Sequence, residues 1–258
     1  MINGVLFLTV VLAVLTFLPL WRHEAWWVRS LDFPRLQLSY VSVLLVLVDM
    51  VQLDFSRLDA WLLFSPGLFC LLYHAWWILP YTPWFKVEVT SEDAADPLRS
   101  IRIMTANVLM TNRNAEAFIE LVREMKPDVL VTLESNGWWQ SKLDLLESDY
   151  AFTIKCPLDN LYGMHVYSRF PLEESAIKYL VEPDVPSMHT LLRLPSGDQI
   201  RMHFLHPAPP SPTENEASSE RDAELIIVAK SVADTDEPVI VTGDLNDVAW
   251  SETTRLFR

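Results

Sequence analysis

Three apolar runs in the first third of the chain constrain its fold most strongly. Residues 4–20 carry no charged side chain, residues 36–53 carry only Asp49, and residues 60–80 contain no Asp, Glu, Lys or Arg. Each run is about long enough to cross the roughly 30 Å hydrocarbon core of a bilayer as a helix. A buried soluble helical core does not account for three such runs in succession. We therefore expect three membrane-spanning helices.

Aromatic residues gather at the ends of these runs, as is typical where a helix meets the membrane surface. They are Trp21, Trp26, Trp27, Trp76, Trp77, Tyr81 and Trp84. The first run has no preceding Lys or Arg and no small-residue cleavage pattern after it, which argues against a removable signal peptide. A carboxylate inside a span is a functional candidate by default. Asp49, however, lies close to the end of its run, and we expect it to reach the interface.

The arginines between the runs predict an orientation. The first connecting segment contains Arg22, Arg29 and Arg35, whereas the second contains only Arg57. Because positive residues concentrate in cytoplasmic loops, we expect the first segment and the large C-terminal part in the cytoplasm. The chain is thus predicted to be a multi-pass membrane protein, with residues 1–85 as the membrane region.

The remainder of the chain is acidic. Residues 86–258 contain 16 lysines and arginines against 29 aspartates and glutamates, a net charge of −13. Such a field does not attract nucleic acid, which is therefore a disfavoured partner, although a divalent cation could bridge to a phosphate locally. Cys70 and Cys156 are not expected to pair, and neither has the spacing of a metal ligand.

Residues 86–99 are polar and acidic and are predicted to be a linker, after which amphipathic segments and short apolar runs follow one another. We expect helices over 113–126, 137–147 and 218–232 and a short one from Ala249. The apolar face of the first is expected to contain Ala117, Phe118, Leu121, Val122 and Met125. We expect strands over 101–108, 129–133, 151–155, 163–168, 174–180, 187–194, 199–206 and 238–242. Because the middle strands lack intervening helices, an α+β arrangement is favoured over a doubly wound parallel fold.

The last predicted strand runs straight into a polar loop, Gly243-Asp-Leu-Asn-Asp247. Asp244 and Asn246 are two positions apart, so in an extended loop their side chains point the same way. A carboxylate and an amide held at a strand end can orient a water molecule against a phosphorus atom. The structural alternative is an Asx-rich turn that caps the next helix.

Other polar residues also stand at strand ends: Asn107, Glu134 and His206. A carboxylate and an amide oxygen suit the hard cations Mg²⁺ and Mn²⁺. An aspartate can orient or deprotonate the attacking water, and a histidine can donate a hydrogen bond to a phosphoryl oxygen that gains charge. Together these residues could supply what phosphoester hydrolysis needs.

Five segments give this pattern a specific resemblance: residues 104–108, 128–134, 162–172, 204–207 and 242–247. In order and approximate spacing they resemble the DNase I-like endonuclease/exonuclease/phosphatase superfamily over about residues 100–258. The chain resembles the bacterial branch in which this domain follows membrane helices, and this resemblance implies that the membrane is a bacterial inner membrane. The resemblance implies a four-layer α/β sandwich, in which two central mixed sheets are flanked by helices.

The resemblance also implies roles for the strand-end residues. Glu134 and Asn107 would hold a Mg²⁺ or Mn²⁺ ion, Glu134 most directly. His206 would contact the scissile phosphate, and Asp244 would orient the nucleophilic water. Asn246 would position either the phosphate or Asp244. The function expected is a divalent-metal-dependent phosphoesterase anchored in the lipid bilayer, hydrolysing phosphodiesters or phosphomonoesters.

Tyr162 is a further candidate for contact with the substrate phosphate, whereas His165 and His203 are expected to be structural. The chain departs from the family in one respect, because the family's Ser-Asp-His segment does not occur before Arg258. On this basis we expect a domain that lacks its C-terminal strands, either as a fragment or as a truncated relative. The alternative function is a catalytically incomplete membrane protein whose degenerate domain serves binding.

Overall fold

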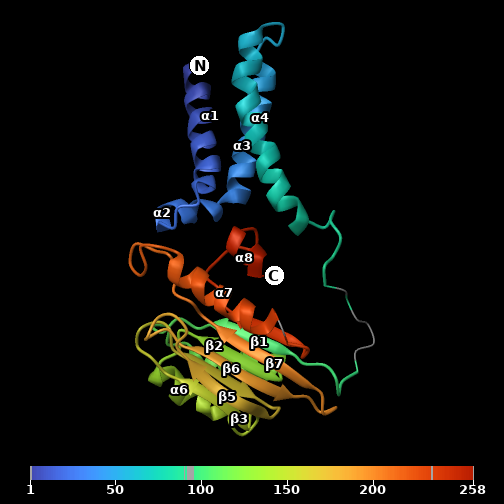
Figure 1. The fold of residues 1–258 in the computed structure, drawn as a ribbon, viewed down its shortest axis with the longest axis vertical. Helices are drawn as coiled ribbons and strands as arrows, with labels where there is room; N and C mark the ends of the chain where they lie inside the picture. Colours follow the sequence, from blue (N-terminus) through green and yellow to red (C-terminus); the bar gives the residue numbers. More distant parts are fainter. Residues whose placement is uncertain (1, 90, 92–95, 234, 258) are drawn as a thin grey trace.

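Three long helices open the structure, a computed structural model (Figure 1). The structure describes residues 2–89, 91, 96–233 and 235–257. The long helices are α1 (Ile2–Phe17), α3 (Arg35–Gln52) and α4 (Leu58–Ile78). They pack through a small apolar core that includes Leu12, Leu45 and Cys70. Each is long and apolar enough to cross a membrane, as the sequence predicts.

The segment between α1 and α3 forms a compact elbow. It contains a 3₁₀ turn (Leu18–Trp21), the short helix α2 (Trp26–Arg29) and a second 3₁₀ turn (Ser30–Asp32). The elbow lies at the end of the helices that faces the rest of the chain (Figure 1).

Asp49 lies within the packing of the long helices. Its residue is only 1% exposed, and a Cβ at Gly67 of α4 would come 3.9 Å from its Oδ2. The carboxylate is thus enclosed where α3 approaches α4, and its position relative to a membrane interface stays a prediction.

Two four-stranded mixed sheets form the centre of the remaining chain. The first has the order β1-β2-β4-β3, with β1 (Ile103–Asn107), β2 (Val129–Leu133), β4 (Met164–Ser168) and β3 (Phe152–Cys156). The second has the order β5-β6-β7-β8, with β5 (Leu172–Lys178), β6 (Ser187–Arg193), β7 (Gln199–Leu205) and β8 (Val239–Gly243). Among these eight strands, β1 pairs with β2 and β7 with β8 in parallel, and the other neighbours pair antiparallel.

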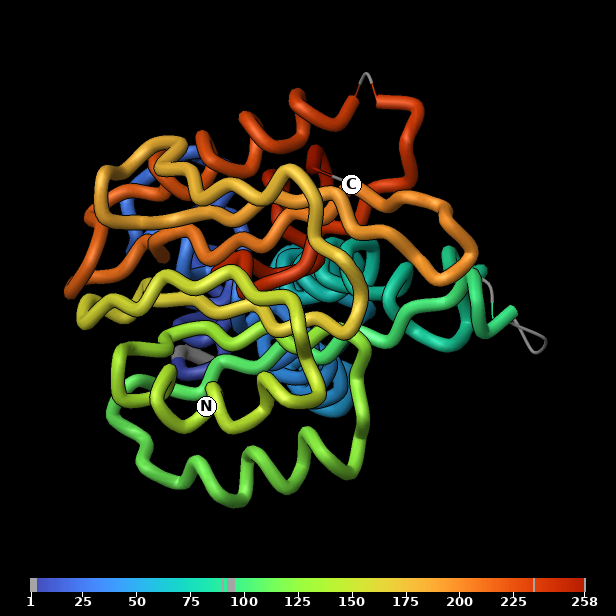
Figure 2. The backbone as a smooth tube through the Cα atoms, turned by 90° about the horizontal axis from the view of Figure 1, so that it is seen from below, coloured from blue at the N-terminus to red at the C-terminus, as the bar shows by residue number. Residues whose placement is uncertain are grey.

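Helices cover the outer face of each sheet, and four layers result (Figure 2). α5 (Ala115–Met125) and α6 (Gly137–Leu143) pack on the first sheet. α7 (Ser219–Ala233) and α8 (Glu252–Phe257) pack on the second. The predicted α+β sandwich of two mixed sheets flanked by helices is confirmed.

The main core lies between the sheets. Val131, Val166, Met202 and Phe204 are completely buried there. All five residues of β2 are buried, which explains why this strand reads as a continuous apolar run rather than an alternating one.

The predicted face of α5 is partly wrong. Its buried residues are Ala115, Ile119 and Val122, whereas Leu121 is 43% exposed and Met125 is 51% exposed. The buried positions follow the i, i+4, i+7 spacing of a helix, so the true stripe is rotated from the predicted one.

The domain contacts the elbow directly. Ala25 forms an antiparallel bridge with Ala217, and the Trp26 N–H donates to the Glu216 carbonyl at 2.9 Å. The described residues of the predicted linker 86–99 form no helix or strand, and residues 90 and 92–95 lie outside the described residues.

Candidate functional site

The sheet topology brings the predicted site residues to one edge of the sandwich. β1 and β2 run parallel, as do β7 and β8, so the carboxyl ends of each pair lie together. Those ends carry Asn107, Glu134, His206 and Asp244. The two sheets meet beside this edge, where the hydroxyl oxygens of Thr105 and Thr242 are 2.7 Å apart.

Asn107 and Glu134 form a direct pair. The Asn107 Nδ2 donates to Glu134 Oε1 at 2.5 Å, and its Oδ1 accepts from the Leu109 N–H at 3.1 Å. Glu134 and Leu109 both have left-handed backbones, with φ of +55° and +58°. Non-glycine residues rarely adopt this conformation, and such residues cluster at functional sites. The pair predicted to hold a metal is thus assembled, with its amide and carboxylate bonded to each other.

His206 is buried at the same edge of the sandwich. Its residue is 3% exposed, and its ring centroid lies 5.5 Å from that of Tyr162. Burial lowers the pKa of His206 below its usual value, although the charges of Asp244, Glu134 and Glu214 favour the protonated ring. Its Nδ1 is buried without a hydrogen-bond partner among the described residues. His206 is therefore a buried imidazole whose burial and neighbouring carboxylates act on its pKa in opposite directions.

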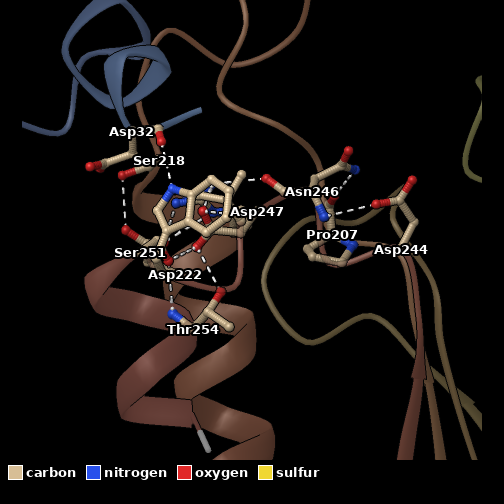
Figure 3. Close-up of polar contacts among 12 residues, drawn as sticks. Asp32, Pro207, Ser218, Asp222, Asp244, Asn246, Asp247, Ser251 and Thr254 are labelled. Carbon is tan, nitrogen blue, oxygen red and sulfur yellow. Dashed lines mark hydrogen bonds and ion pairs between the residues drawn. The ribbon is translucent and has the colours of Figure 1, made fainter. Parts of the chain in front are cut away.

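The loop after β8 is held in a tight turn (Figure 3). Gly243 has φ +151°, and a Cβ there would lie 1.8 Å from the Leu205 carbonyl oxygen, so only glycine fits. The Asn246 N–H donates to Asp244 Oδ1 at 3.0 Å, and its Nδ2 donates to the Pro207 carbonyl at 2.9 Å. The contact with Asp244 comes from the Asn246 backbone and the contact with Pro207 from its side chain, so both roles considered for the Asn246 side chain stay predictions. The same contacts also make the Asx turn of the structural alternative.

Arg221 of α7 is a site residue that sequence reasoning missed. It is 3% exposed, its Nη1 donates to the Asn246 carbonyl at 2.9 Å, and the same nitrogen lies 3.5 Å from Asp247 Oδ1. Asp247 also accepts hydrogen bonds from Ser251 at 2.5 Å and Thr254 at 3.1 Å (Figure 3). Arg221 thus ties α7 to the loop that carries Asp244. An arginine in an amphipathic helix gives no sequence signal for this contact.

Tyr162 does not present a free hydroxyl. It donates a hydrogen bond to the Glu214 carboxylate, and burial together with this carboxylate raises the pKa of the phenol. His165 is fully buried. His203 lies 2.6 Å from His189 between their Nδ1 atoms. His165 and His203 are thus both packed within the sandwich, which is the arrangement expected for structural histidines.

A hollow of about 480 Å³ opens beside the site. Its lining includes Asn107, Asp244, Asp247, Ala249 and Thr254. Within the described ranges, no group of three or more His, Cys, Asp and Glu side chains is placed to hold a metal ion. Mg²⁺ is usually held in enzymes by only one or two carboxylates together with water and substrate phosphate. The oxygen donors at this edge fit that requirement.

Comparison with known proteins agrees with this architecture. The sequence model described as "Endonuclease/Exonuclease/phosphatase family" matches residues 104–258. A humanized TDP2 from D. rerio superposes with a TM-score of 0.50 at 20% identity, over 58% of this chain and 64% of that one. D. rerio TDP2 complexed with a single-strand DNA product gives 0.50 at 19% identity, over 58% and 62%. The human Nocturnin catalytic domain with a bound sulfate anion gives 0.50 at 18% identity, over 60% and 68%.

The chain spans less than two thirds of the length of both TDP2 chains. No curated protein matches it. At such low identity the solved structures establish the fold alone, whereas the family match covers more than half of the chain. This chain belongs to the endonuclease/exonuclease/phosphatase family.

Proposed function

We propose that the protein is a divalent-metal-dependent phosphoesterase anchored in a membrane by α1, α3 and α4. The observation that carries the proposal is the convergence of Glu134, Asn107, His206 and Asp244 at one edge of the sandwich, beside an open hollow. Family membership supports hydrolysis of phosphoester bonds as the reaction class.

Glu134 and Asn107 are the proposed metal-holding residues. In the structure the Asn107 Nδ2 faces the Glu134 carboxylate, so the amide has to rotate before its oxygen can share a cation with Glu134. A bound Mg²⁺ or Mn²⁺ would supply positive charge to the phosphoryl oxygens and polarise the phosphorus.

Asp244 is the proposed base and His206 the proposed hydrogen-bond donor. The Asn246 N–H fixes one oxygen of Asp244, which leaves the carboxylate oriented at the edge of the hollow. Asp244 accepts a proton as the water oxygen bonds to phosphorus, the bond from phosphorus to the leaving oxygen breaks, and that oxygen takes up a proton. Even as a neutral imidazole, His206 carries one ring N–H for a phosphoryl oxygen.

The elbow supports a cytoplasmic position for the domain. Arg22 and Arg29 belong to the elbow, which contacts the domain, and Arg35 begins α3 directly after it. Positive residues concentrate on the cytoplasmic side. An Asp198→Cys variant places a thiol on the exposed hairpin turn of the domain. It should react with an impermeant maleimide only after the cells are permeabilised.

Hydrolysis of two soluble chromogenic esters tests the proposed activity. The full chain in detergent should hydrolyse bis(p-nitrophenyl) phosphate or p-nitrophenyl phosphate with Mg²⁺ or Mn²⁺ and lose this activity in EDTA. Asp244→Asn and Glu134→Gln should each lower the rate by about 10²-fold or more. The matched control is Asp149→Asn, which replaces an exposed aspartate and should leave the rate unchanged. Absence of metal-dependent turnover would contradict the proposal.

A second candidate, a domain that binds a ligand without turnover, is favoured by one observation. Two polar pairs of the site already bond within the protein: Asn107 donates to Glu134, and Tyr162 donates to Glu214. Calorimetry with Mn²⁺ separates the two candidates, because binding that depends on Glu134 without any hydrolysis would favour the second.

A further inference from the structure

We propose that the substrate is a phosphoester that is itself anchored in the bilayer by an apolar chain. This inference rests on the proposed function and names the substrate class of the same site. The observations behind it are the contacts that fix the site edge against the ends of the long helices.

The loop that carries Asp244 continues directly into contact with these helix ends. The Tyr81 hydroxyl donates to the Ala249 carbonyl at 2.5 Å, and the Trp250 Nε1 donates to the Asp32 carbonyl at 2.7 Å. The rings of Tyr81 and Trp250 are 6.0 Å apart. Figure 3 shows Asp32, on the elbow, above the Asp247 network of this loop. We call the Tyr81 and Trp250 contacts the clamp.

The loop after β7 is attached to the same elbow. The Ser218 N–H donates to the Glu24 carbonyl at 2.8 Å, and Ser219 donates to the Glu24 carboxylate at 2.7 Å. This loop begins beside His206. The loops after β7 and β8 are therefore both attached to the ends of the long helices and their elbow. If these helices span a bilayer, the part of the site edge that carries His206 and Asp244 lies on the side of the domain nearest to it.

The depth of the site follows from the clamp. Tyr81 ends the apolar stretch Leu58–Tyr81, and its hydrogen-bond acceptor, Ala249, lines the hollow together with Asp244. Interfacial tyrosine and tryptophan side chains lie at the level of the lipid headgroups. The headgroup layer is only about 5–8 Å thick on each side of the hydrocarbon core. A phosphate in this layer lies at the depth of the hollow while its apolar chain remains in the bilayer.

The charge of the domain disfavours the main alternative. A soluble polyanion such as single-stranded nucleic acid would have to enter a gap between the bilayer and a domain of net charge −13. An anchored ester diffuses in the membrane plane and meets the site without crossing that field.

A matched pair of esters tests the inference: methyl p-nitrophenyl phosphate, which is soluble, and hexadecyl p-nitrophenyl phosphate, which inserts into lipid. The full chain is assayed with Mg²⁺ or Mn²⁺ in phosphatidylcholine nanodiscs. Anchoring should raise kcat/KM for the hexadecyl ester by roughly 10²-fold over the methyl ester, because it holds the phosphate at the depth at which the clamp fixes the hollow. In every case water adds to phosphorus and p-nitrophenolate leaves.

A clamp variant distinguishes two causes of a preference for the hexadecyl ester: the position of the hollow at the membrane surface, and the simple accumulation of this ester in lipid. Tyr81→Phe combined with Trp250→Phe removes both hydrogen bonds and keeps the rings. It should lose most of the preference for the hexadecyl ester and keep its rate on the methyl ester. The control Trp61→Phe removes a similar bond, to the Phe55 carbonyl at 3.0 Å, at the far end of α4, and should keep the preference.

The outcomes are distinct. Equal or faster turnover of the methyl ester, or of a single-stranded oligonucleotide, overturns the inference and leaves the proposed phosphoesterase intact. A preference that survives in the clamp variant also overturns it, because accumulation in lipid then explains the effect. Turnover of neither ester with either metal overturns the proposed function and the inference together.

Discussion

Replacing Arg221 with methionine should destabilise the protein more than the loss of any surface ion pair. Arg221 is 3% exposed and bonds the Asn246 carbonyl, and it pairs with Asp222 at 2.8 Å and with Asp247 at 3.5 Å. The Arg221→Met variant removes the charge and keeps most of the side-chain volume. It leaves Asp247, whose side chain is 3% exposed, without its buried cation.

The magnitude follows from the geometry. At 3.5 Å, an effective dielectric constant of about 20 gives a gross attraction of about 5 kcal/mol. Removing one partner of a buried pair typically costs about 3–5 kcal/mol. We expect the lower part of that range, because Ser251 and Thr254 still donate to Asp247. For a domain of this size the melting temperature should then fall by roughly 6–12 °C.

Thermal unfolding of the full chain in detergent measures this effect. Arg193→Met is the matched control, because its pair with Glu173 is 2.8 Å long but exposed, and such a pair contributes about 0–1 kcal/mol. The double variant Arg221→Met/Asp247→Asn should be roughly 1–3 kcal/mol more stable than the sum of the single effects predicts. A melting temperature for Arg221→Met equal to that of Arg193→Met would refute the reasoning.

Three further predictions concern single positions. Gly243→Ala should prevent folding of the loop or cost more than about 3 kcal/mol, since its Cβ would meet a carbonyl at 1.8 Å; Gly137→Ala, with nothing within 4 Å, is the control, and both are compared by thermal unfolding. Burial raises the pKa of Glu224 to about 7, so the stability that its protonated form contributes is present below pH 4.5 and is lost as pH rises towards 7. Glu224→Gln should therefore flatten the pH dependence of the melting temperature between those values. Tyr162→Phe should leave kcat nearly unchanged, because the hydroxyl is bonded to Glu214; a loss as large as that of Asp244→Asn would show a direct role.

The sequence predicted the elements of the domain well because local signals were strong. β2 was predicted at its observed bounds because Pro127-Asp128 ends the preceding helix and five apolar or β-branched residues follow. The buried face of α5 was predicted less well, because apolar residues occupy a wider part of the helix surface than the part that is buried. Packing against β2 decides that Ile119 and Val122 are the buried ones. The elbow helix α2 was missed, because its tryptophans read as membrane-interface residues.

The candidate site was predictable only in part. Asn107, Glu134, His206 and Asp244 stand at strand ends, and the topology brings strand ends together, so their convergence could be foreseen. The contacts that complete the site could not, because they join residues far apart in sequence. Arg221 reaches the loop from another helix, and Glu214 occupies the hydroxyl of Tyr162. The catalytic roles themselves stay predictions.

The left-handed backbone at the site edge has a consequence for how such a domain evolves. Leu109, Glu134 and Asn246 have φ values of +58°, +55° and +51°. Leu109 and Glu134 each cost about 1–2 kcal/mol relative to a relaxed residue, whereas asparagine tolerates this conformation. The two together amount to a sizeable part of the roughly 5–15 kcal/mol that holds a domain folded. Glycine at position 134 would relieve this strain and delete the carboxylate at the same time. Selection for heat resistance alone should therefore drive these positions towards glycine, and keeping Glu134 under such selection is evidence that the edge is used.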